Sequence, residues 1–340
     1  MKSKHKIPLI GVDLLGGENN LPEHLLEVIK GLFNEVARPF RLLVFATPEF
    51  SLKIKQFGRE NPSIFKENRV LTLEVKEVIL MDDEPLLAIR RKKEASICVG
   101  MRMLEKKEID VFVSTGNTGA LIASAMMYLP MLEGITRAAL LKLLPTKKNP
   151  IAVIDVGANI HCKPEHLVQF AKMGLAYQKT QGIENPKVGL LNIGTEEKKG
   201  RAELQETYQL LLNFNQKTVD NQRTFIGNVE GKQVFSGDVQ VLVTDGFTGN
   251  VFLKTAEGIS FFILETLHEN QDILPFPKTL LKRLENDLYY AEYPGAILCG
   301  VDGIVMKCHG DATPQALING IKGAINLAHT EFLEKMKSYL

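Results

Sequence analysis

Six short segments rich in Gly, Asn, Thr and Asp each follow an apolar stretch of the chain. They cover residues 13–17, 114–119, 155–159, 192–195, 245–250 and 309–312. Segments of this composition can expose backbone N–H groups, which bind anions such as phosphate when they lie beside a helix N-terminus. Gly and Asn are also ordinary turn and cap residues, so one segment alone carries little weight. Six together predict an anion-binding site.

The segment 161–166 holds the densest group of reactive side chains, with the sequence His-Cys-Lys-Pro-Glu-His. It could bind a metal ion if the distant Cys-His pair at 308–309 supplied further ligands, or Cys162 could act as a nucleophile beside a base. It could also be surface charge at the start of a helix. A fourth interpretation, which we favour, makes Lys163 and His166 an anion-binding and acid/base pair, because lysine is a strong phosphate ligand.

Several motifs that define other chemistries are absent from the sequence. It has no GxxxxGK[ST] phosphate loop, no GxGxxG after an apolar strand, no GxSxG around a serine nucleophile and no HExxH zinc motif. These absences weaken the case for nucleotide, dinucleotide, serine-nucleophile and zinc chemistry.

The apolar pattern predicts the elements that position these segments. Short runs rich in Val, Ile and Leu predict strands at 7–13, 41–46, 70–76, 110–114, 138–144, 151–156, 187–192, 239–244 and 303–308. The stretches between them have helical spacing, and runs such as 151–154 are apolar on both faces, which is typical of a sheet covered by helices. The alternation predicts an α/β fold, a three-layer sandwich around a parallel or mixed sheet. In such a fold ligands gather at the carboxyl ends of the strands, so the six segments could share one crevice.

Composition excludes several classes of protein. The chain has 340 residues, of which 45% are hydrophobic and 24% are charged, and its net charge is +1. That profile is typical of a globular protein, and it provides no general positive field for nucleic acid. The four cysteines form no CxxC pair, which fits a reducing compartment. The basic start lacks the apolar run of a signal peptide, so we expect a cytoplasmic protein.

The sequence shows no obvious linker. We predict one α/β catalytic unit over residues 1–340, with a helical arm at about 255–292 for contact with a second subunit and with a membrane. The polar stretch 195–219 has helical spacing and could form a separate layer or arm.

Read together, the segments resemble one family, the PlsX phosphate acyltransferases of bacterial phospholipid synthesis. The resemblance lies in DLLGG (13–17), VSTGNTGA (113–120), GITR (134–137), IDVGAN (154–159) with CKPEHLVQFA (162–171), GLLNIG (189–194), GNVEG (227–231) and DGFTGNV (245–251). These motifs stand in the family's order and cover roughly residues 9 to 329. Leu14, Leu15 and Glu18 depart from the usual family residues, and 307–312 is a looser match around His309.

The resemblance implies a fold, a reaction and partners. The fold would be that of phosphotransacetylase and isopropylmalate dehydrogenase, in a homodimer. The reaction would convert acyl-[acyl carrier protein] and inorganic phosphate into acyl phosphate and free carrier, with no metal and no organic cofactor. The acyl phosphate would pass to a membrane acyltransferase that acts on glycerol 3-phosphate, which implies a cytoplasmic protein that attaches peripherally to an anionic membrane surface.

The resemblance also implies roles for individual residues. Lys163 would neutralise the phosphate, His166 would be the general acid/base, and Asn192, Asn250 or a backbone N–H group of a loop would donate to the tetrahedral oxyanion. The residues expected to bind phosphate or substrate are Asp13, Gly16, Gly17, Ser114, Gly116, Asn117, Thr118, Asp155, Gly157, Asn159, Asn228, Asp245, Asn250 and His309.

Two other functions fit parts of the sequence. A dehydrogenase of the isopropylmalate type would share the fold but would need NAD and a divalent metal, with Asp13 and Asp245 as ligands. A noncatalytic scaffold could carry acyl carrier protein to the membrane on the same surfaces.

Two surfaces are candidates for contact with these partners. A basic group at 90–93 with Arg102, Lys106 and Lys107 is expected on one helix, either as a solvated face or as a docking site for the acidic carrier. The segments 258–267 and 273–284 are expected to form amphipathic helices. They join at the apolar tip Leu274-Pro275-Phe276 beside Lys278, Lys282 and Arg283. That tip could meet anionic headgroups, while the helices could instead pack in a dimer.

Overall fold

The chain divides into two compact units. The computed structural model describes residues 7–17, 22–217, 223–270, 277, 279, 281, 282, 284 and 295–340. Unit 1 comprises Met1–Leu132 and Tyr293–Glu334, and unit 2 comprises Glu133–Glu292 and Lys335–Leu340. The prediction that residues 1–340 form one catalytic unit stays a prediction.

Unit 1 is built on a mostly parallel sheet with the strand order β3-β2-β1-β4-β11-β10. The strands are β1 (Leu9–Asp13), β2 (Arg41–Ala46), β3 (Val70–Glu74), β4 (Val111–Ser114), β10 (Ala296–Cys299) and β11 (Ile304–Lys307). Strand β10 is antiparallel to β11, and the other pairs are parallel. The carboxyl ends of β1, β2, β4 and β11 therefore lie at the same edge of the sheet.

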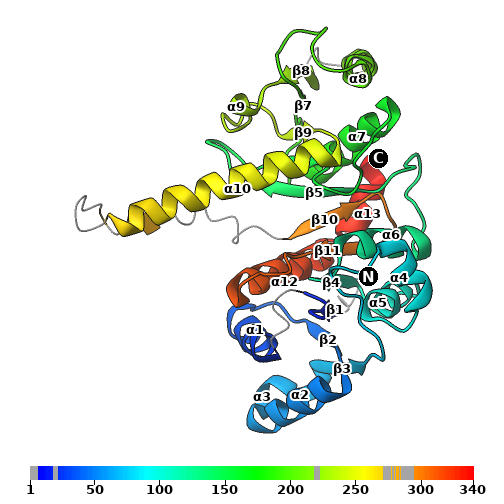
Figure 1. Cartoon of the computed structure of the whole chain (residues 1–340), viewed down its shortest axis with the longest axis vertical. Coiled ribbons are helices and arrows are strands. Elements are labelled where there is room, and N and C mark those ends of the chain that lie inside the picture. The colour runs from blue at the N-terminus through cyan, green and yellow to red at the C-terminus, as the bar shows by residue number, and fades with distance from the viewer. Residues whose placement is uncertain are drawn as a thin grey trace, which may run out of the picture. The chain divides into compact units, whose positions relative to one another are not determined.

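Helices cover both faces of the unit 1 sheet (Figure 1). They are α1 (Pro22–Glu35), α2 (Pro48–Glu60), α3 (Pro62–Phe65), α4 (Pro85–Arg91), α5 (Ser96–Glu105), α6 (Thr118–Tyr128) and α12 (Pro314–His329), with a 3₁₀ turn η1 (Lys66–Asn68). Helices α1 and α12 pack together on one face, and α5 and α6 pack on the other with α4 against α6. A Cβ on Gly100 would lie 2.1 Å from the Phe112 ring, so glycine is what lets α5 approach β4 this closely.

Unit 2 has a second sheet segment with the order β5-β6-β9-β7-β8. Its strands are β5 (Ala139–Leu144), β6 (Ile151–Ile154), β7 (Val188–Leu191), β8 (Phe225–Val229) and β9 (Val241–Val243). Strand β5 is antiparallel to β6, and the remaining pairs are parallel. Its helices are α7 (Pro164–Thr180), α8 (Ala202–Leu212), α9 (Gly231–Val234) and α10 (Gly246–Glu269), with a 3₁₀ turn η2 (Asn213–Lys217). Helix α13 (Phe332–Tyr339) has residues up to Glu334 in unit 1 and residues from Lys335 in unit 2.

Local sequence signals explain where the helices begin. Thr47, Asp245 and Thr313 each cap a helix by accepting a hydrogen bond from a first-turn N–H group, and proline follows Thr47 and Thr313 at the first helical position. Strands β1, β4, β6, β7 and β9 are buried along their whole length. Helix packing on both faces accounts for that burial.

The predicted α/β class with a mixed sheet is confirmed, and each of the nine predicted strands is present, the strand at 41–46 with the predicted bounds and the other eight in shorter form. Two strands, β8 and β10, escaped prediction. β8 carries Gly227 and Asn228, which are turn residues in most contexts, and β10 has only four residues. Within the stretch 195–219, helix α8 and the turn η2 form. Of the predicted arm, α10 is present up to Glu269, whereas the tip Leu274-Pro275-Phe276, Lys278 and Arg283 lie outside the described residues.

No helix among the described residues is both long enough and apolar enough to cross a membrane.

Candidate functional site

Three of the six predicted segments converge in unit 1. They follow β1, β4 and β11, and they touch at glycines. A Cβ on Gly17 would lie 3.0 Å from the Gly310 carbonyl oxygen and 3.2 Å from the Thr115 hydroxyl. Gly16 has φ of +75°, and a Cβ there would lie 2.2 Å from the Ile79 carbonyl oxygen. Only glycine allows this close approach with that backbone conformation.

Asp13 organises these loops from a fully buried position. Its Oδ2 accepts a hydrogen bond from the Ser114 hydroxyl (2.8 Å) and its Oδ1 accepts one from the Leu15 N–H (3.1 Å). The Ser114 oxygen in turn accepts from the Gly116 N–H (3.0 Å). Burial raises the pKa of Asp13 to about 6, against the lowering effect of these hydrogen bonds and of the positive Lys307. Asp13 therefore shapes the loop, and a buried carboxylate is a poor partner for a phosphate.

The Asn117 side chain is also committed to the loop structure. Its Nδ2 donates to the carbonyl oxygens of Leu80, Met81 and Asp83, and its Oδ1 caps α6 by accepting from the Ala120 N–H. The expected binding role of Asn117 can therefore pass only through its backbone. Thr118 opens α6, and the first-turn N–H groups of a helix have no acceptor within the helix, so this end favours an anion.

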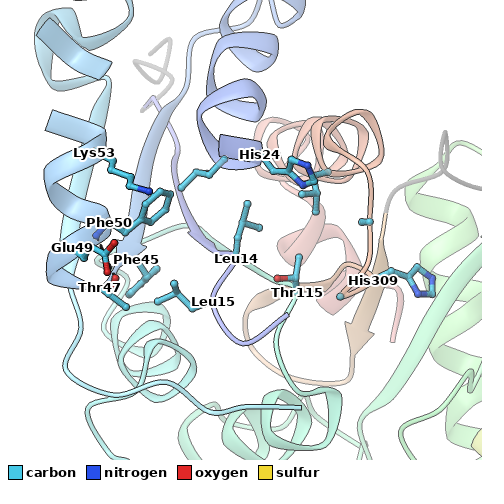
Figure 2. A pocket seen from close by; sticks show the side chains of 14 residues that line it. Leu14, Leu15, His24, Phe45, Thr47, Glu49, Phe50, Lys53, Thr115 and His309 are labelled. Carbon is cyan, nitrogen blue, oxygen red and sulfur yellow. Dashed lines mark hydrogen bonds between the residues drawn. The ribbon is translucent and has the colours of Figure 1, made fainter. Parts of the chain in front are cut away.

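A cavity of about 310 Å³ opens at the strand ends of unit 1 (Figure 2). It is lined by Leu14, Leu15, His24, Leu25, Phe45, Thr47, Glu49, Phe50, Lys53, Thr115, His309, Gly310, Ala312 and Leu317. His309, an expected substrate-binding residue, is exposed and lies at this cavity. The sequence prediction missed Lys307, whose Nζ donates to the Thr115 carbonyl oxygen (3.1 Å) and so ties two of the loops together.

The other three segments lie in unit 2, where Asp155 plays the part that Asp13 plays in unit 1. Its Oδ1 accepts from the N–H groups of Leu140, Gly157 and Ala158. Its Oδ2 accepts from the backbone N–H and the side-chain Nδ2 of Asn159. Burial raises the pKa of Asp155, although all these hydrogen bonds oppose the rise. Asp155 and Asn159 thus hold the loop 155–159 in shape.

This loop packs directly on the first turn of α10. The Gly246 N–H donates to the Asn159 carbonyl oxygen (2.7 Å). A Cβ on Gly249 would lie 1.9 Å from the Asp155 carbonyl oxygen, so only glycine permits the contact. Asp245 caps α10 by accepting from the Thr248 N–H and hydroxyl, and it pairs with the Arg201 guanidinium. The Arg201 side chain is 51% exposed, and nothing in the sequence pattern had marked it.

The same loop leads into α7, which begins at Lys163 and Pro164. Lys163 is exposed, and its backbone N–H donates to Nδ1 of His166 (3.2 Å). Because Nδ1 accepts this bond, a neutral His166 carries its proton on Nε2. Burial lowers the pKa of His166, and the positive Arg137 and Lys163 lower it further. The imidazole is therefore a neutral donor near neutral pH.

The structure weakens two of the four interpretations of 161–166. Burial, together with the carboxylates of Asp155 and Asp245, raises the pKa of Cys162 to about 12, so the thiol stays protonated and is a weak nucleophile. The Cys-His pair at 308–309 belongs to unit 1, whereas 161–166 belongs to unit 2. In the part of the chain that the structure describes, no three His, Cys, Asp or Glu side chains are grouped to bind a metal ion.

The remaining three of the five predicted asparagines, Asn192, Asn228 and Asn250, differ in what they can do. The Asn192 amide donates to the Lys199 carbonyl oxygen (3.0 Å) and its oxygen accepts from the Ile193 N–H, so it shapes the following loop. Asn228 donates to the Glu196 carbonyl oxygen (2.8 Å) and is 6% exposed. Asn250 is exposed beside the 155–159 loop, where a Cβ on Gly157 would lie 3.8 Å from its Oδ1.

The predicted residues thus form one group in each unit. Unit 1 holds Asp13, Gly16, Gly17, Ser114, Gly116, Asn117, Thr118 and His309, and unit 2 holds Asp155, Gly157, Asn159, Lys163, His166, Asn192, Asn228, Asp245 and Asn250.

Solved structures with a similar fold are phosphotransacetylases. The phosphotransacetylase of Streptococcus pyogenes matches with a TM-score of 0.61 and 13% identity, over 96% of this chain and 94% of that one. The EutD phosphotransacetylase of Staphylococcus aureus matches with a TM-score of 0.58 and 14% identity, over 99% of this chain and 95% of that one. A 4-hydroxythreonine-4-phosphate dehydrogenase of Klebsiella pneumoniae also matches, with a TM-score of 0.55 and 11% identity over 97% of this chain and 100% of that one. The chain therefore has the α/β fold of phosphotransacetylases and of such dehydrogenases.

Sequence comparison is more specific than the fold. The family described as "Fatty acid synthesis protein" matches residues 9–335. A phosphate acyltransferase of Chlamydia pneumoniae is 38% identical over 97% of this chain and 98% of its own length. One of Desulfitobacterium hafniense is 40% identical over 97% of both chains. The chain belongs to the PlsX family of phosphate acyltransferases, as the motifs had indicated, and so to the acyltransferases of fatty acid and phospholipid synthesis.

Proposed function

We propose that this chain transfers the acyl group of an acyl-[acyl carrier protein] to inorganic phosphate, which gives acyl phosphate and free carrier. One observation carries the proposal: the loop 155–159 packs on the N-terminus of α10 and leads into the N-terminus of α7, where Lys163 and His166 lie. Two helix N-termini and a lysine favour a phosphate dianion. Membership of the PlsX family supports acyl transfer to that phosphate.

The nucleophile in this reaction is the phosphate itself. One phosphate oxygen attacks the thioester carbonyl carbon, the C–S bond breaks, and the proton of hydrogen phosphate moves to the leaving sulfur. No protein nucleophile is needed, which agrees with the raised pKa of the Cys162 thiol. The protein contributes mainly by placing the two reactants, and such placement can supply roughly 7–11 kcal/mol of the barrier.

Lys163 and His166 have separate roles in the proposal. Lys163 neutralises phosphate charge from the exposed start of α7. His166 presents Nε2–H, because its Nδ1 is occupied by the Lys163 N–H. Nε2 can give its proton to the leaving sulfur and take the phosphate proton in return, which makes it an acid first and a base second.

Asn250 is the better of the two candidates for the oxyanion. The Asn192 amide is used within its own loop, whereas Asn250 lies exposed on the first turn of α10 beside Gly157. A hydrogen-bond donor that meets the developing negative charge typically lowers the activation barrier by about 3–4 kcal/mol. Asn228 and Asp245 then act by positioning the loops around 196 and 201.

The decisive experiment mixes the protein with an acyl-[acyl carrier protein], radiolabelled phosphate and EDTA, without NAD. Radiolabelled acyl phosphate is the expected product. Activity that appears only after a divalent metal and NAD are added would instead identify the dehydrogenase. That enzyme would need the carboxylates of Asp13 and Asp245 to be available as metal ligands. Both carboxylates are already engaged, Asp13 with Ser114 and Asp245 with Arg201. Carrier binding without any product would identify the scaffold.

The proposal extends to the partners of this reaction: a homodimer, attachment to an anionic membrane surface, and delivery of acyl phosphate to a membrane glycerol-3-phosphate acyltransferase. Large apolar side chains along α10 that are at least 41% exposed support a contact there. They are Phe247, Val251, Ile259, Phe261, Phe262 and Ile263. Flotation with anionic vesicles and measurement of the mass in solution would separate membrane contact from dimer contact.

A further inference from the structure

The cavity of unit 1 has no part in the phosphate chemistry derived above, yet it opens at the strand ends that bear the predicted binding loops. Its lining includes Thr115 after β4 and Gly310 after β11, and Gly17 touches both of these residues. In parallel sheets ligands bind at this edge. The cavity therefore has the position of a substrate subsite.

Seven of the fourteen lining residues of this cavity have apolar side chains, and His24, Thr47 and Thr115 are among the polar ones. Leu25, Phe45, Phe50 and Leu317 are buried. Figure 2 shows Leu14 and Leu15 between Phe45 and Phe50 on one side and Thr115 on the other. Burial of apolar surface favours an apolar ligand by about 0.8 kcal/mol for each methylene group. The buried apolar part of the lining suits a hydrocarbon chain, whereas His24, Thr47 and Thr115 suit polar groups of the same ligand.

The charged groups of the cavity lie toward its rim and have both signs. Lys53 and Glu49 are exposed residues of α2, and His309 is exposed in the loop after β11. Because the Glu49 carboxylate would repel a phosphate, these three residues do not form a phosphate site. They do make the mouth of the cavity polar. An amphipathic ligand with an apolar body and a polar end fits this distribution.

We propose that this cavity holds the alkyl chain of the acyl group, with the polar end of the ligand toward the mouth of the cavity. The inference rests on the proposed acyl transfer, and it assigns the acyl-chain subsite to unit 1. A volume of about 310 Å³ is at the lower end of the range for small-molecule sites, which suits one slender chain. The cavity then limits the length of chain that the enzyme accepts.

Ala312 provides a direct test, because it is a small, partly exposed residue on the cavity wall. Ala312→Phe should fill part of the space. We expect kcat/KM for palmitoyl-[acyl carrier protein] to fall about 10-fold or more, while kcat/KM for the butyryl thioester stays within about 2-fold. The matched control is Leu52→Phe, because Leu52 lies on α2, is 66% exposed and is not part of the lining. A thermal melt of each variant would show that the fold is intact.

The outcomes separate this inference from the proposed function. If the wild-type protein makes no acyl phosphate from either thioester, the proposed function fails. If it does and Ala312→Phe lowers both thioesters equally, the cavity holds the carrier's thiol arm and the inference is wrong. The inference is also wrong if Ala312→Phe has the wild-type ratio of palmitoyl to butyryl rates, whatever its total activity.

A binding measurement tests the same cavity without catalysis. The chain contains no tryptophan, so Ala312→Trp introduces a single fluorescent reporter. A brominated long-chain fatty acid should quench this tryptophan at low concentration, whereas a Leu52→Trp reporter should need at least about 10-fold more. Equal quenching of the two reporters would contradict the proposed chain site.

Discussion

The two units use the same device at their strand ends, a buried aspartate that folds a glycine-rich loop, but they surround it differently. Asp13 in unit 1 accepts hydrogen bonds from Ser114, Ser96 and Leu15, and apolar and polar side chains line the neighbouring cavity in similar number. Asp155 in unit 2 receives five, and the loop it holds leads to Lys163. Both aspartates therefore have a structural role. The two units differ in the side chains that lie beside their loops. The loop of unit 2 leads to the exposed Lys163, and the loops of unit 1 border a cavity whose buried part is apolar.

The largest effect is expected from removal of Asp155. Asp155→Ala leaves five donors without their acceptor, and unsatisfied buried donors are costly, so we expect a loss of about 3–5 kcal/mol in the free energy of unfolding. Urea denaturation measures it. The exposed carboxylate of Glu184 in the same unit provides the control, since Glu184→Ala should cost less than about 0.5 kcal/mol. A small loss in Asp155→Ala would mean that the loop holds its shape without the carboxylate.

The raised pKa of Asp13 should make the free energy of unfolding depend on pH. Burial raises its pKa from 3.8 to about 6, so between these values the folded chain keeps a proton that the unfolded chain has released. The contribution of Asp13 to the free energy of unfolding is therefore highest below about pH 4, falls by about 3 kcal/mol as the pH rises from about 4 to about 6, and changes little above that.

Asp13→Asn should remove this slope, while Asp82→Asn, which changes an exposed carboxylate of the same unit, should keep it. Urea denaturation of the three proteins across this pH range is the measurement. If the wild-type and Asp13→Asn curves run parallel, the pKa of Asp13 is not raised in the folded protein.

Lys163 tests the claim that unit 2 carries the cations for phosphate. Lys163→Ala should lower kcat/KM for phosphate about 100-fold, because one charged contact to the reacting group is lost. Lys172 is an exposed lysine further along the same helix, so Lys172→Ala is a matched control and should behave like wild type. Wild-type kinetics in phosphate for Lys163→Ala would remove this residue from the site.

His166 should act as a neutral donor rather than as a cation. Since burial and the positive Arg137 and Lys163 lower its pKa, activity should persist on the acidic side of its ordinary value of 6.5. His166→Gln should lower kcat about 10-fold to 100-fold and abolish the acidic limb of the rate profile. A pH profile identical to that of wild type would leave His166 with a packing role only.

The sequence was sufficient for the class of fold and for the residues at the strand ends, because strand burial and turn composition are local signals. It was insufficient for their roles. Asn117, Asn159 and Asn192 have the composition of ligand-binding residues, yet their amides bond carbonyl groups that lie 37, 21 and 7 residues away along the chain. Arg201 was missed because its partner, Asp245, lies 44 residues further on. Such long-range pairs leave no trace in spacing or periodicity.

The smallest effect concerns the basic group on unit 1. The sequence predicted it on one helix, and this was wrong: it spans α4, α5 and the turn between them, because α4 ends at Arg91 and α5 begins at Ser96. The structure also shows two of its members already engaged, Lys92 with Asp83 and Arg102 with Glu94.

Arg90 and Arg91 are exposed at the end of α4. If they steer an acidic carrier protein, Arg90→Glu with Arg91→Glu should raise KM for the carrier thioester about 3-fold to 10-fold and flatten its dependence on salt, with kcat unchanged. The comparison pair is Lys106→Glu with Lys107→Glu, two exposed members of the same basic group that follow α5. A larger effect from the second pair would move carrier docking to the end of α5. An unchanged salt dependence in both would exclude this face of unit 1 as the docking surface and would leave unit 2 to bind the carrier as well as the phosphate.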